Sequence, residues 1–201
     1  MPTVSLYRRM LCEQFDKLPE ALRGFHDLPE GGRGRGRFQI ERGAGSIARM
    51  LGLLLRFPVA GTNVRLTLNV SVEGDRERWV RDFGGRRLKS IQWVQDGLLI
   101  EKAGLIRFAF RLSADEAGMR FAFQRAWLLS VPLPGFLSPQ IEASVLAEDC
   151  GWRVDVQMSL PWGAPSYATV ECSYRNHRTD QETQSILNTW RNGNTLKDTL
   201  R

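Results

Sequence analysis

Alternating apolar and polar positions dominate the chain from about residue 63 onward and predict antiparallel strands. The run from Val64 to Val72 alternates strictly, as a strand does when one of its faces is buried. Turn-forming residues separate further runs rich in strand formers, which predict strands over residues 37–42, 76–83, 86–95, 98–102, 105–112, 119–129, 140–147, 152–160 and 167–174. Many short strands joined by tight turns are typical of an antiparallel meander that is closed or strongly curved.

The segment from Glu73 to Glu101 is the best defined part of this pattern. Gly84-Gly85 separates two strand-forming runs, and a pair of residues that tolerate positive φ predicts a two-residue hairpin turn. The turn sets the register, and the predicted cross-strand pairs are Phe83 with Arg86, Asp82 with Arg87 and Trp79 with Ser90.

In this register, both faces of the hairpin carry a mixture of apolar and basic side chains. One face holds Trp79, Arg81, Phe83 and Leu88, and the other holds Val80, Ile91 and Trp93. One interpretation is a curved sheet whose concave face lines a cavity with a polar mouth. The other is a different register, in which arginine stems cover apolar surface while their charged ends stay in water.

The first part of the chain follows a helical period. Apolar residues recur at helical spacing over residues 3–16, with Thr3 or Ser5 as the N-cap, and a short second helix is predicted over residues 19–23, ended by Gly24. The stretch PEGGRGRGR at residues 29–37 lacks the preceding strand and the GxGxxG spacing of a dinucleotide-binding loop, so it predicts a flexible basic loop. A third helix over residues 47–57, with Ser46 as N-cap, is apolar almost all round, which predicts burial in the core or a lid over an apolar cavity.

These patterns predict an α+β fold with two or three helices in the N-terminal part. The sheet is expected to be antiparallel and strongly curved, a half or full β-barrel of about 8–10 strands. A length of 201 residues suits one domain of ordinary size plus an appendage. We expect a single domain over residues 1–175, followed by a polar tail over residues 176–201 that is loosely attached or disordered.

Composition narrows the class of protein further. No run approaches the ~20 apolar residues of a membrane helix, and the N-terminus lacks the apolar region of a secretory signal. The three cysteines are scattered and form no CxxC pair, so we expect neither a disulfide framework nor a zinc site. The same cysteine usage predicts a cytoplasmic location. The net charge of +6 suits nucleic acid, an anionic lipid surface or an acidic ligand, but 24 of the 28 basic residues are arginine, a skew that a GC-rich genome also produces.

Five local patterns, in this order along the chain, resemble a known family. They are ALRGFHD at residues 21–27, ERG at 41–43 before a leucine-rich helix, ERWVRDFGGR at 77–86 with Gln92-Trp93, DGLL at 96–99, and PLP at 132–134 with Pro139. Over about residues 6 to 175, their order and spacing resemble the bacterial family called domain of unknown function 4166. In some members the domain follows a saccharopine-dehydrogenase-like domain, so the resemblance implies a functional association with such a protein. It supports the domain boundary and supplies no mechanism.

Two sets of side chains are candidates for a functional site. His26, Asp27 and Glu41 are the candidates for acid–base chemistry, with a structural hydrogen bond as the alternative role for the histidine. The second set combines aromatic and arginine side chains on successive strands: Trp79, Arg81, Phe83, Arg86, Arg87, Trp93 and Trp127. A curved sheet would gather this set around an apolar pocket with an anionic head group at its rim; the alternative is an aromatic core with a solvated basic face.

Metal and cofactor chemistry is not expected. Two separated histidines and dispersed cysteines do not supply three or four clustered metal ligands, and GxSxG, P-loop and HExxH patterns do not occur.

Three classes of function therefore stay open. The favoured one is a binding module for an amphipathic or acidic small molecule or lipid, held between the sheet and the helix over residues 47–57. The second is an acid–base enzyme on the same scaffold, built around His26. The third is a weak single-stranded nucleic-acid binder, because aromatic and arginine side chains on a sheet can stack on bases; without an RNP-like strand motif, no specific nucleic-acid binding is expected.

Overall fold

The computed structural model describes residues 4–27, 29–41, 60–149 and 151–159, together with the backbone of residues 166–173. Three short helical segments come first: α1 (Leu6–Leu11), the 3-10 helix η1 (Cys12–Lys17) and α2 (Glu20–His26). The strands are β1 (Arg33–Glu41), β2 (Gly61–Glu73), β3 (Arg76–Phe83), β4 (Arg86–Gln95), β5 (Leu98–Ala103), β6 (Ile106–Asp115), β7 (Gly118–Leu128), β8 (Val131–Pro132), β9 (Gln140–Glu148), β10 (Gly151–Ser159) and β11 (Ser166–Ser173).

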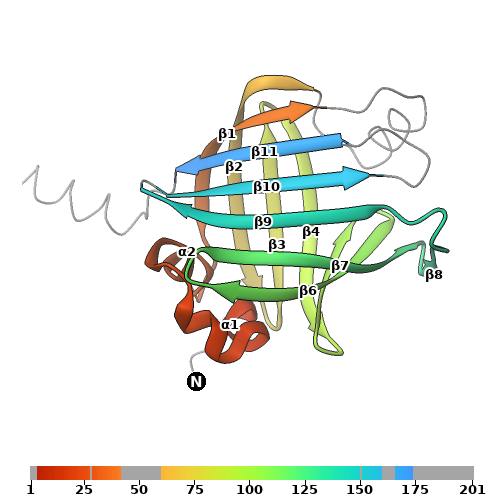
Figure 1. Ribbon diagram of the computed structural model, residues 1–201, viewed down its shortest axis with the longest axis horizontal. Coiled ribbons are helices and arrows are strands. Elements are labelled where there is room, and N and C mark those ends of the chain that lie inside the picture. The colour runs from red at the N-terminus through yellow and green to blue at the C-terminus, as the bar shows by residue number, and fades with distance from the viewer. Residues whose placement is uncertain (1–3, 28, 42–59, 150, 160–165, 174–201) are drawn as a thin grey trace, which may run out of the picture.

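The strands form one antiparallel sheet that closes on itself. Their order is β6-β5-β4-β3-β2-β1-β11-β10-β9-β7-β8, and β6 also pairs with β7, so the strands other than β8 form a ring. In Figure 1, strands β6, β7, β9, β10 and β11 run across the front of β2, β3 and β4, with α1 and α2 at one end. The predicted α+β class, with a strongly curved antiparallel sheet and helices near the N-terminus, is confirmed.

The central hairpin has the predicted register. Phe83 pairs with Arg86 and Trp79 with Ser90, and both turn glycines have positive φ, 61° for Gly84 and 101° for Gly85. The Asp82 carboxylate accepts a hydrogen bond of 2.6 Å from the Gly85 amide, which fixes the turn. The side chains of β3 and β4 therefore divide between two faces as the sequence predicts.

The N-terminal helices differ from the prediction in their limits. Ser5 is the N-cap, with its hydroxyl accepting from the Arg8 amide at 3.3 Å, but α1 ends at Leu11 because Cys12 has a positive φ of 50°. The chain continues as the 3-10 helix η1. The second helix was predicted to end at Gly24, yet α2 continues to His26 with Asp27 as its C-cap. Gly24 lies within this helix and is exposed, and an added Cβ there would have no neighbour within 4 Å.

The glycine–arginine stretch is mostly a strand, and its prediction as a flexible loop is wrong for residues 33–36, which lengthen the strand predicted from residue 37. Arg33, Arg35 and Arg37 are exposed on the outer face of β1, whereas Gly34 lies on the inner face. A Cβ on Gly34 would touch the side chains of Leu68 and Trp152 at 3.7 Å, so a small residue fits beside the Trp152 ring. The strand is hard to see in the sequence because its inward positions carry no apolar side chain.

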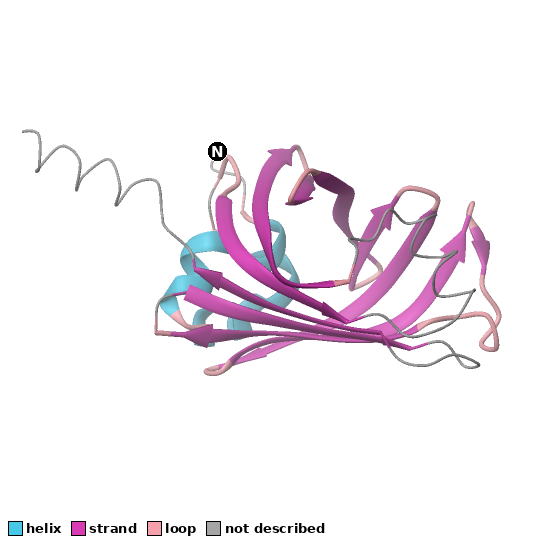
Figure 2. Cartoon of the chain, turned by 90° about the horizontal axis from the view of Figure 1, so that it is seen from above, coloured by secondary structure: helices cyan, strands magenta, loops and turns pink. Residues whose placement is uncertain are grey.

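The helices cover one end of the ring and complete the core there. The segments α1 and η1 contact β6, and α2 contacts β10. Phe15, Leu22, Leu99 and Met119 are completely buried in this region. Figure 2 shows the helices, in cyan, at one end of the strands. None of the helices that the structure describes has the length and apolar character needed to cross a bilayer.

The inner face toward the other end of the ring is less completely buried. Inward-facing apolar side chains there are only partly buried: Val64, Leu88, Phe123, Val156 and Met158. The predicted helix over residues 47–57, the supposed lid, and the predicted tail over residues 176–201 both lie outside the described residues.

Candidate functional site in the barrel interior

Polar side chains occupy the inner face of three neighbouring strands. The strand register places Glu77, Gln92 and Glu101 in one row across β3, β4 and β5, and it places Ser90 opposite Trp79. Arg81 lies on the same face of β3, two residues beyond Trp79. A cluster of ionisable and amide groups therefore lies among the apolar side chains that otherwise fill the ring.

Arg81 forms the centre of this cluster. Its Nη1 donates to Ser90 Oγ at 2.8 Å and to Glu101 Oε1 at 3.1 Å, and the Ser90 hydroxyl donates to the same Glu101 oxygen at 2.6 Å. The guanidinium carbon lies 4.9 Å from the centre of the Trp79 ring. The arginine is therefore held by a carboxylate on one side and an aromatic face on another.

The Arg81–Glu101 pair is not sealed from solvent. The side chains of Arg81 and Glu101 are 21% and 20% exposed, although both lie on the inner face of the ring. Backbone pairing closes the wall, so an inward side chain meets solvent through the interior. The partly buried apolar residues Leu88 and Phe123 lie on the same inner surface. Solvent therefore reaches the Arg81 side chain through the interior of the ring.

The helices supply the other part of the cluster. The Tyr7 hydroxyl donates to Gln92 Oε1 at 2.9 Å, and the His26 ring packs on the Tyr7 ring with their centres 4.0 Å apart. The Trp79 indole donates to Glu77 Oε2 at 3.0 Å, and its ring centre lies 6.0 Å from that of His26. Helix α1 and strands β3 and β4 are thus joined by polar contacts inside the core.

Burial controls the protonation of these groups. Burial lowers the pKa of His26 to about 3, so the imidazole is neutral at physiological pH. Burial raises the pKa of Glu77 to about 7, against the hydrogen bond from Trp79 and the charge of Arg9. The pKa of Tyr7 is raised well above its ordinary value, first by burial and then by the charges of Glu77 and Glu101, so its hydroxyl stays a donor.

Glu77 is thus the group of this cluster whose charge changes near neutrality. It also lines a small hollow of about 10 Å³, together with Leu6, Arg9 and Arg76, which is room for roughly one water molecule. A proton can therefore reach this carboxyl group from solvent, although the side chain is buried.

The three acid–base candidates lie in separate surroundings. His26 is buried against Tyr7, whereas Asp27 is exposed and its carboxylate pairs with Arg8 at 3.0 Å, a hydrogen bond that lowers the pKa of Asp27. Glu41 is exposed at the last position of β1, and the strand between Arg33 and Glu41 is about 26 Å long. The structure does not bring the three together. Its described residues contain no group of three His, Cys, Asp or Glu side chains that could hold a metal ion.

The predicted aromatic–arginine set is divided between the two faces of the wall. Trp79, Arg81 and Phe83 lie inside, and Arg86 is exposed at the hairpin end, opposite Phe83. Arg87, Trp93 and Trp127 lie outside. Arg87 pairs with Asp82 at 3.0 Å, Arg76 stacks on Trp93 at 5.3 Å, and Arg107 stacks on Trp127 at 4.3 Å. The structure therefore brings only the first three together in the interior.

Sequence reasoning missed five members of the interior cluster: Tyr7, Glu77, Ser90, Gln92 and Glu101. The register set by Gly84-Gly85 already places Ser90 and Gln92 on the face of Trp79, and the Asp96-Gly97 turn extends the row to Glu101. Polar residues at inward positions were thus a readable signal. Tyr7 belongs to a helix, and the strand register does not determine where that helix packs against the barrel.

These features define a small α+β barrel with a polar cluster inside a mostly apolar interior. The sequence model of one family, Domain of unknown function (DUF4166), matches residues 18–168, and the chain belongs to this family. The match confirms the family resemblance of the sequence motifs. Neither a curated protein nor a solved structure matches the chain.

Proposed function

We propose that the barrel is a binding module for an amphipathic small molecule or lipid with an acidic head group, held inside the ring with the head group at Arg81. One observation carries the proposal. Arg81 points into a closed ring, yet a fifth of its side chain is exposed. Arginine suits a carboxylate or phosphate, because its planar fork can donate two parallel hydrogen bonds.

The apolar part of such a ligand has a matching surface. Partly buried apolar side chains share the inner face with Arg81, among them Leu88, which pairs with Arg81 across β3 and β4, and Phe123. Small-molecule sites are usually apolar surfaces with a few placed polar groups. An arginine beside such side chains would hold the head group while the apolar chain of the ligand lies against them.

Glu101 is the internal competitor of the ligand. It neutralises Arg81 in the empty protein, which lowers the cost of keeping a guanidinium inside the ring. The bonds of Arg81 to Ser90 and Glu101 both use Nη1, so the Nε–Nη2 edge of the fork is the one that we assign to the ligand.

Native mass spectrometry of the protein purified from its own host, followed by organic extraction, tests the proposal. We expect a co-purified lipid or amphipathic acid. A ligand-free protein that also fails to bind a long-chain fatty acid would overturn the proposal, and the aromatic side chains inside the ring would then serve packing alone.

Variants locate the site. Replacing both members of the pair, in Arg81→Gln/Glu101→Gln, should weaken binding of a long-chain fatty acid about tenfold or more while leaving the alcohol of the same chain length unaffected. Glu101→Gln alone should strengthen binding of the acid, because Arg81 loses its internal partner. Arg87→Gln, on the outer face of the next strand, is the matched control and should change neither. Equal effects on acid and alcohol would exclude Arg81 as the head-group site.

A further inference from the structure

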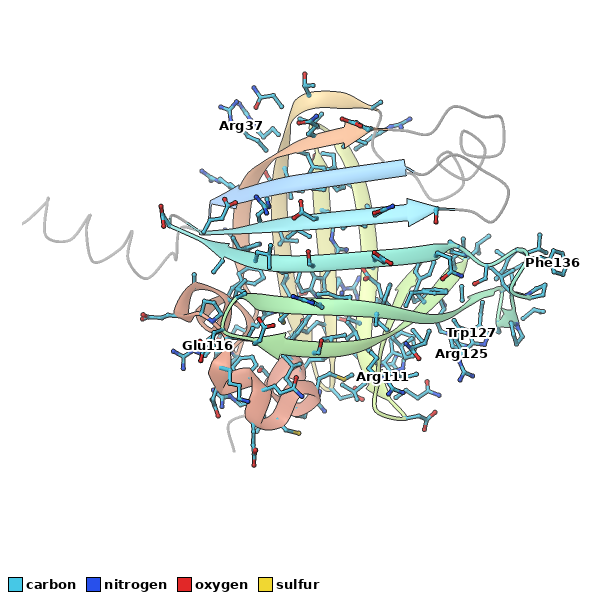
Figure 3. All side chains as sticks on the ribbon, in the orientation of Figure 1. Arg37, Arg111, Glu116, Arg125, Trp127 and Phe136 are labelled. Atoms are coloured by element: carbon cyan, nitrogen blue, oxygen red, sulfur yellow. The ribbon has the colours of Figure 1, made fainter. Side chains whose placement is uncertain are left out.

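Large apolar side chains are exposed at one corner of the outer surface. Of the six that stand out among the described residues, only Val4 lies elsewhere; the others are Leu105, Leu129, Val131, Phe136 and Leu137. We call these five the apolar corner. The Leu129 amide donates to the Leu105 carbonyl at 2.9 Å, so the β5–β6 turn and the β7–β8 turn lie side by side. Figure 3 shows Phe136 at one extreme end of the molecule, with Trp127 and Arg125 near it.

Leu129 occupies a position that suits neither its backbone nor its side chain. Leu129 and Ser130 form the two-residue turn after β7 with φ of 51° and 74°, a conformation that normally selects Asn or Gly. The Leu129 side chain is also 65% exposed. Leu129 has both a strained positive φ and a solvent-exposed apolar side chain. This combination indicates a surface used for contact.

Cations and tryptophan form a layer directly behind the apolar corner. One row across the sheet runs from Lys102 on β5 through Arg107 on β6 to Trp127 on β7. The next row places Ile100 and Ala109 beside Arg125. Arg107 and Arg125 both stack on the Trp127 ring, with their guanidinium carbons 4.3 and 5.8 Å from its centre. No Asp or Glu occupies either row between β4 and β7 in the described sheet.

The depth of this layering matches a lipid surface. Arg107 follows Leu105 by two residues and Trp127 precedes Leu129 by two, which places the cationic layer about 7 Å behind the tips. Apolar faces of peripheral proteins enter a bilayer by roughly 5–10 Å, and tryptophan and arginine are favoured at the level of the head groups. The rows contain only positive charge, which is complementary to anionic lipid.

We propose that the apolar corner, the row of Lys102, Arg107 and Trp127, and Arg125 of the next row form a docking surface for a bilayer that contains anionic lipids. The corner inserts Leu105, Leu129 and Phe136 among the acyl chains, and the cations meet the phosphates. This surface is on the outside of the wall and is separate from the interior site at Arg81. The further inference therefore does not depend on the proposed function.

Sedimentation with vesicles tests the proposal. We expect the protein to bind vesicles of phosphatidylcholine and phosphatidylserine, and to bind vesicles of phosphatidylcholine alone far more weakly. Leu129→Asp/Phe136→Asp should weaken binding to the anionic vesicles about tenfold or more. Lys102→Gln/Arg125→Gln should have a similar effect and should remove most of the preference for anionic lipid.

Matched controls come from the same chain. Val4→Asp adds a charge at an exposed apolar residue outside the corner, and Arg33→Gln/Arg35→Gln removes two exposed cations from β1. Both should bind vesicles as the parent protein does, and all variants should keep its melting temperature. The proposal is overturned if the parent does not sediment with anionic vesicles at ~0.15 M salt, or if the controls lose binding equally. It is also overturned if the corner variants bind vesicles normally and only retention on single-stranded RNA falls in the cation variants.

Discussion

Tyr7 on α1 donates a hydrogen bond of 2.9 Å to Gln92 on β4, joining two residues that are 85 positions apart. Both side chains are almost completely buried. The bond therefore fixes the N-terminal helix to the inner face of the barrel rather than to its surface.

Removing this hydroxyl should destabilise the fold without changing its shape. Tyr7→Phe leaves the Gln92 carbonyl oxygen buried without its donor, which costs about 1–3 kcal/mol. For a domain of this size, each kcal/mol lowers the melting temperature by about 2–4 °C. Calorimetry of the variant checks this. An unchanged melting temperature would show that the Gln92 amide finds another partner.

Glu77 should make the protein less stable as the pH rises. Its folded pKa of about 7 lies above the ordinary pKa of 4.5, so the unfolded chain binds fewer protons between these values. Stability present at low pH is therefore lost as the pH rises from 4.5 to 7. Glu77→Gln keeps an acceptor for the Trp79 indole and should exceed the parent in stability by up to about 3 kcal/mol at alkaline pH, with little difference in acid. Denaturant unfolding across this range measures the difference, and a constant difference would contradict the assigned pKa.

His26 should have the opposite effect. Its folded pKa of about 3 lies below the ordinary 6.5, so the unfolded chain takes up the proton first, and stability is lost as the pH falls below 6.5. The loss approaches about 1.4 kcal/mol per pH unit. His26→Phe keeps an aromatic ring against Tyr7 and should gain on the parent protein as the solution becomes more acidic. Between pH 4.5 and 6.5 the effects of His26 and Glu77 oppose each other, so each single variant should reveal a slope that is hidden in the parent.

Two glycines should respond to alanine in opposite directions. Gly31 has a φ of 97°, and a Cβ there would overlap the carbonyl of Val70, which pairs with the neighbouring Gly32 at 3.0 Å. Gly31→Ala should therefore cost more than about 3 kcal/mol and reduce the yield of folded protein. Gly24 lies inside α2 with open space around it, so Gly24→Ala should add about 0.5–1 kcal/mol. Chemical denaturation of both variants checks the pair; destabilisation by Gly24→Ala would mean that its helical surface contacts something.

The sequence predicted the strands well because their signals are local. Gly84-Gly85 and Asp96-Gly97 fix two turns, and each turn determines which side chains share a face, so the placement of Trp79 and Arg81 on one face followed from counting. The beginning of β1 could not be found in this way, because Gly34 and Gly36 stand where a strand normally shows apolar residues.

The predicted aromatic–arginine set was assembled from residue type, which does not show on which side of the wall a side chain lies. Trp93 and Trp127 were grouped with Trp79 because all are aromatic and lie on successive strands, whereas the wall of the ring separates them. The contacts of Tyr7 and His26 depend on how the helices pack over the end of the ring, which is a tertiary relationship without a local sequence pattern.

The pairing of β1 with β11 has a consequence for synthesis on the ribosome. Arg35 pairs with Ser173, so the wall cannot close until nearly the whole domain has left the exit tunnel. Until then, β1 presents a bare edge on which a neighbouring nascent chain can add a strand. Arg33, Arg35 and Arg37 place three like charges along that edge, and two copies of it repel each other. The arginines of β1 should therefore disfavour pairing between two growing chains during the interval before the last strand arrives.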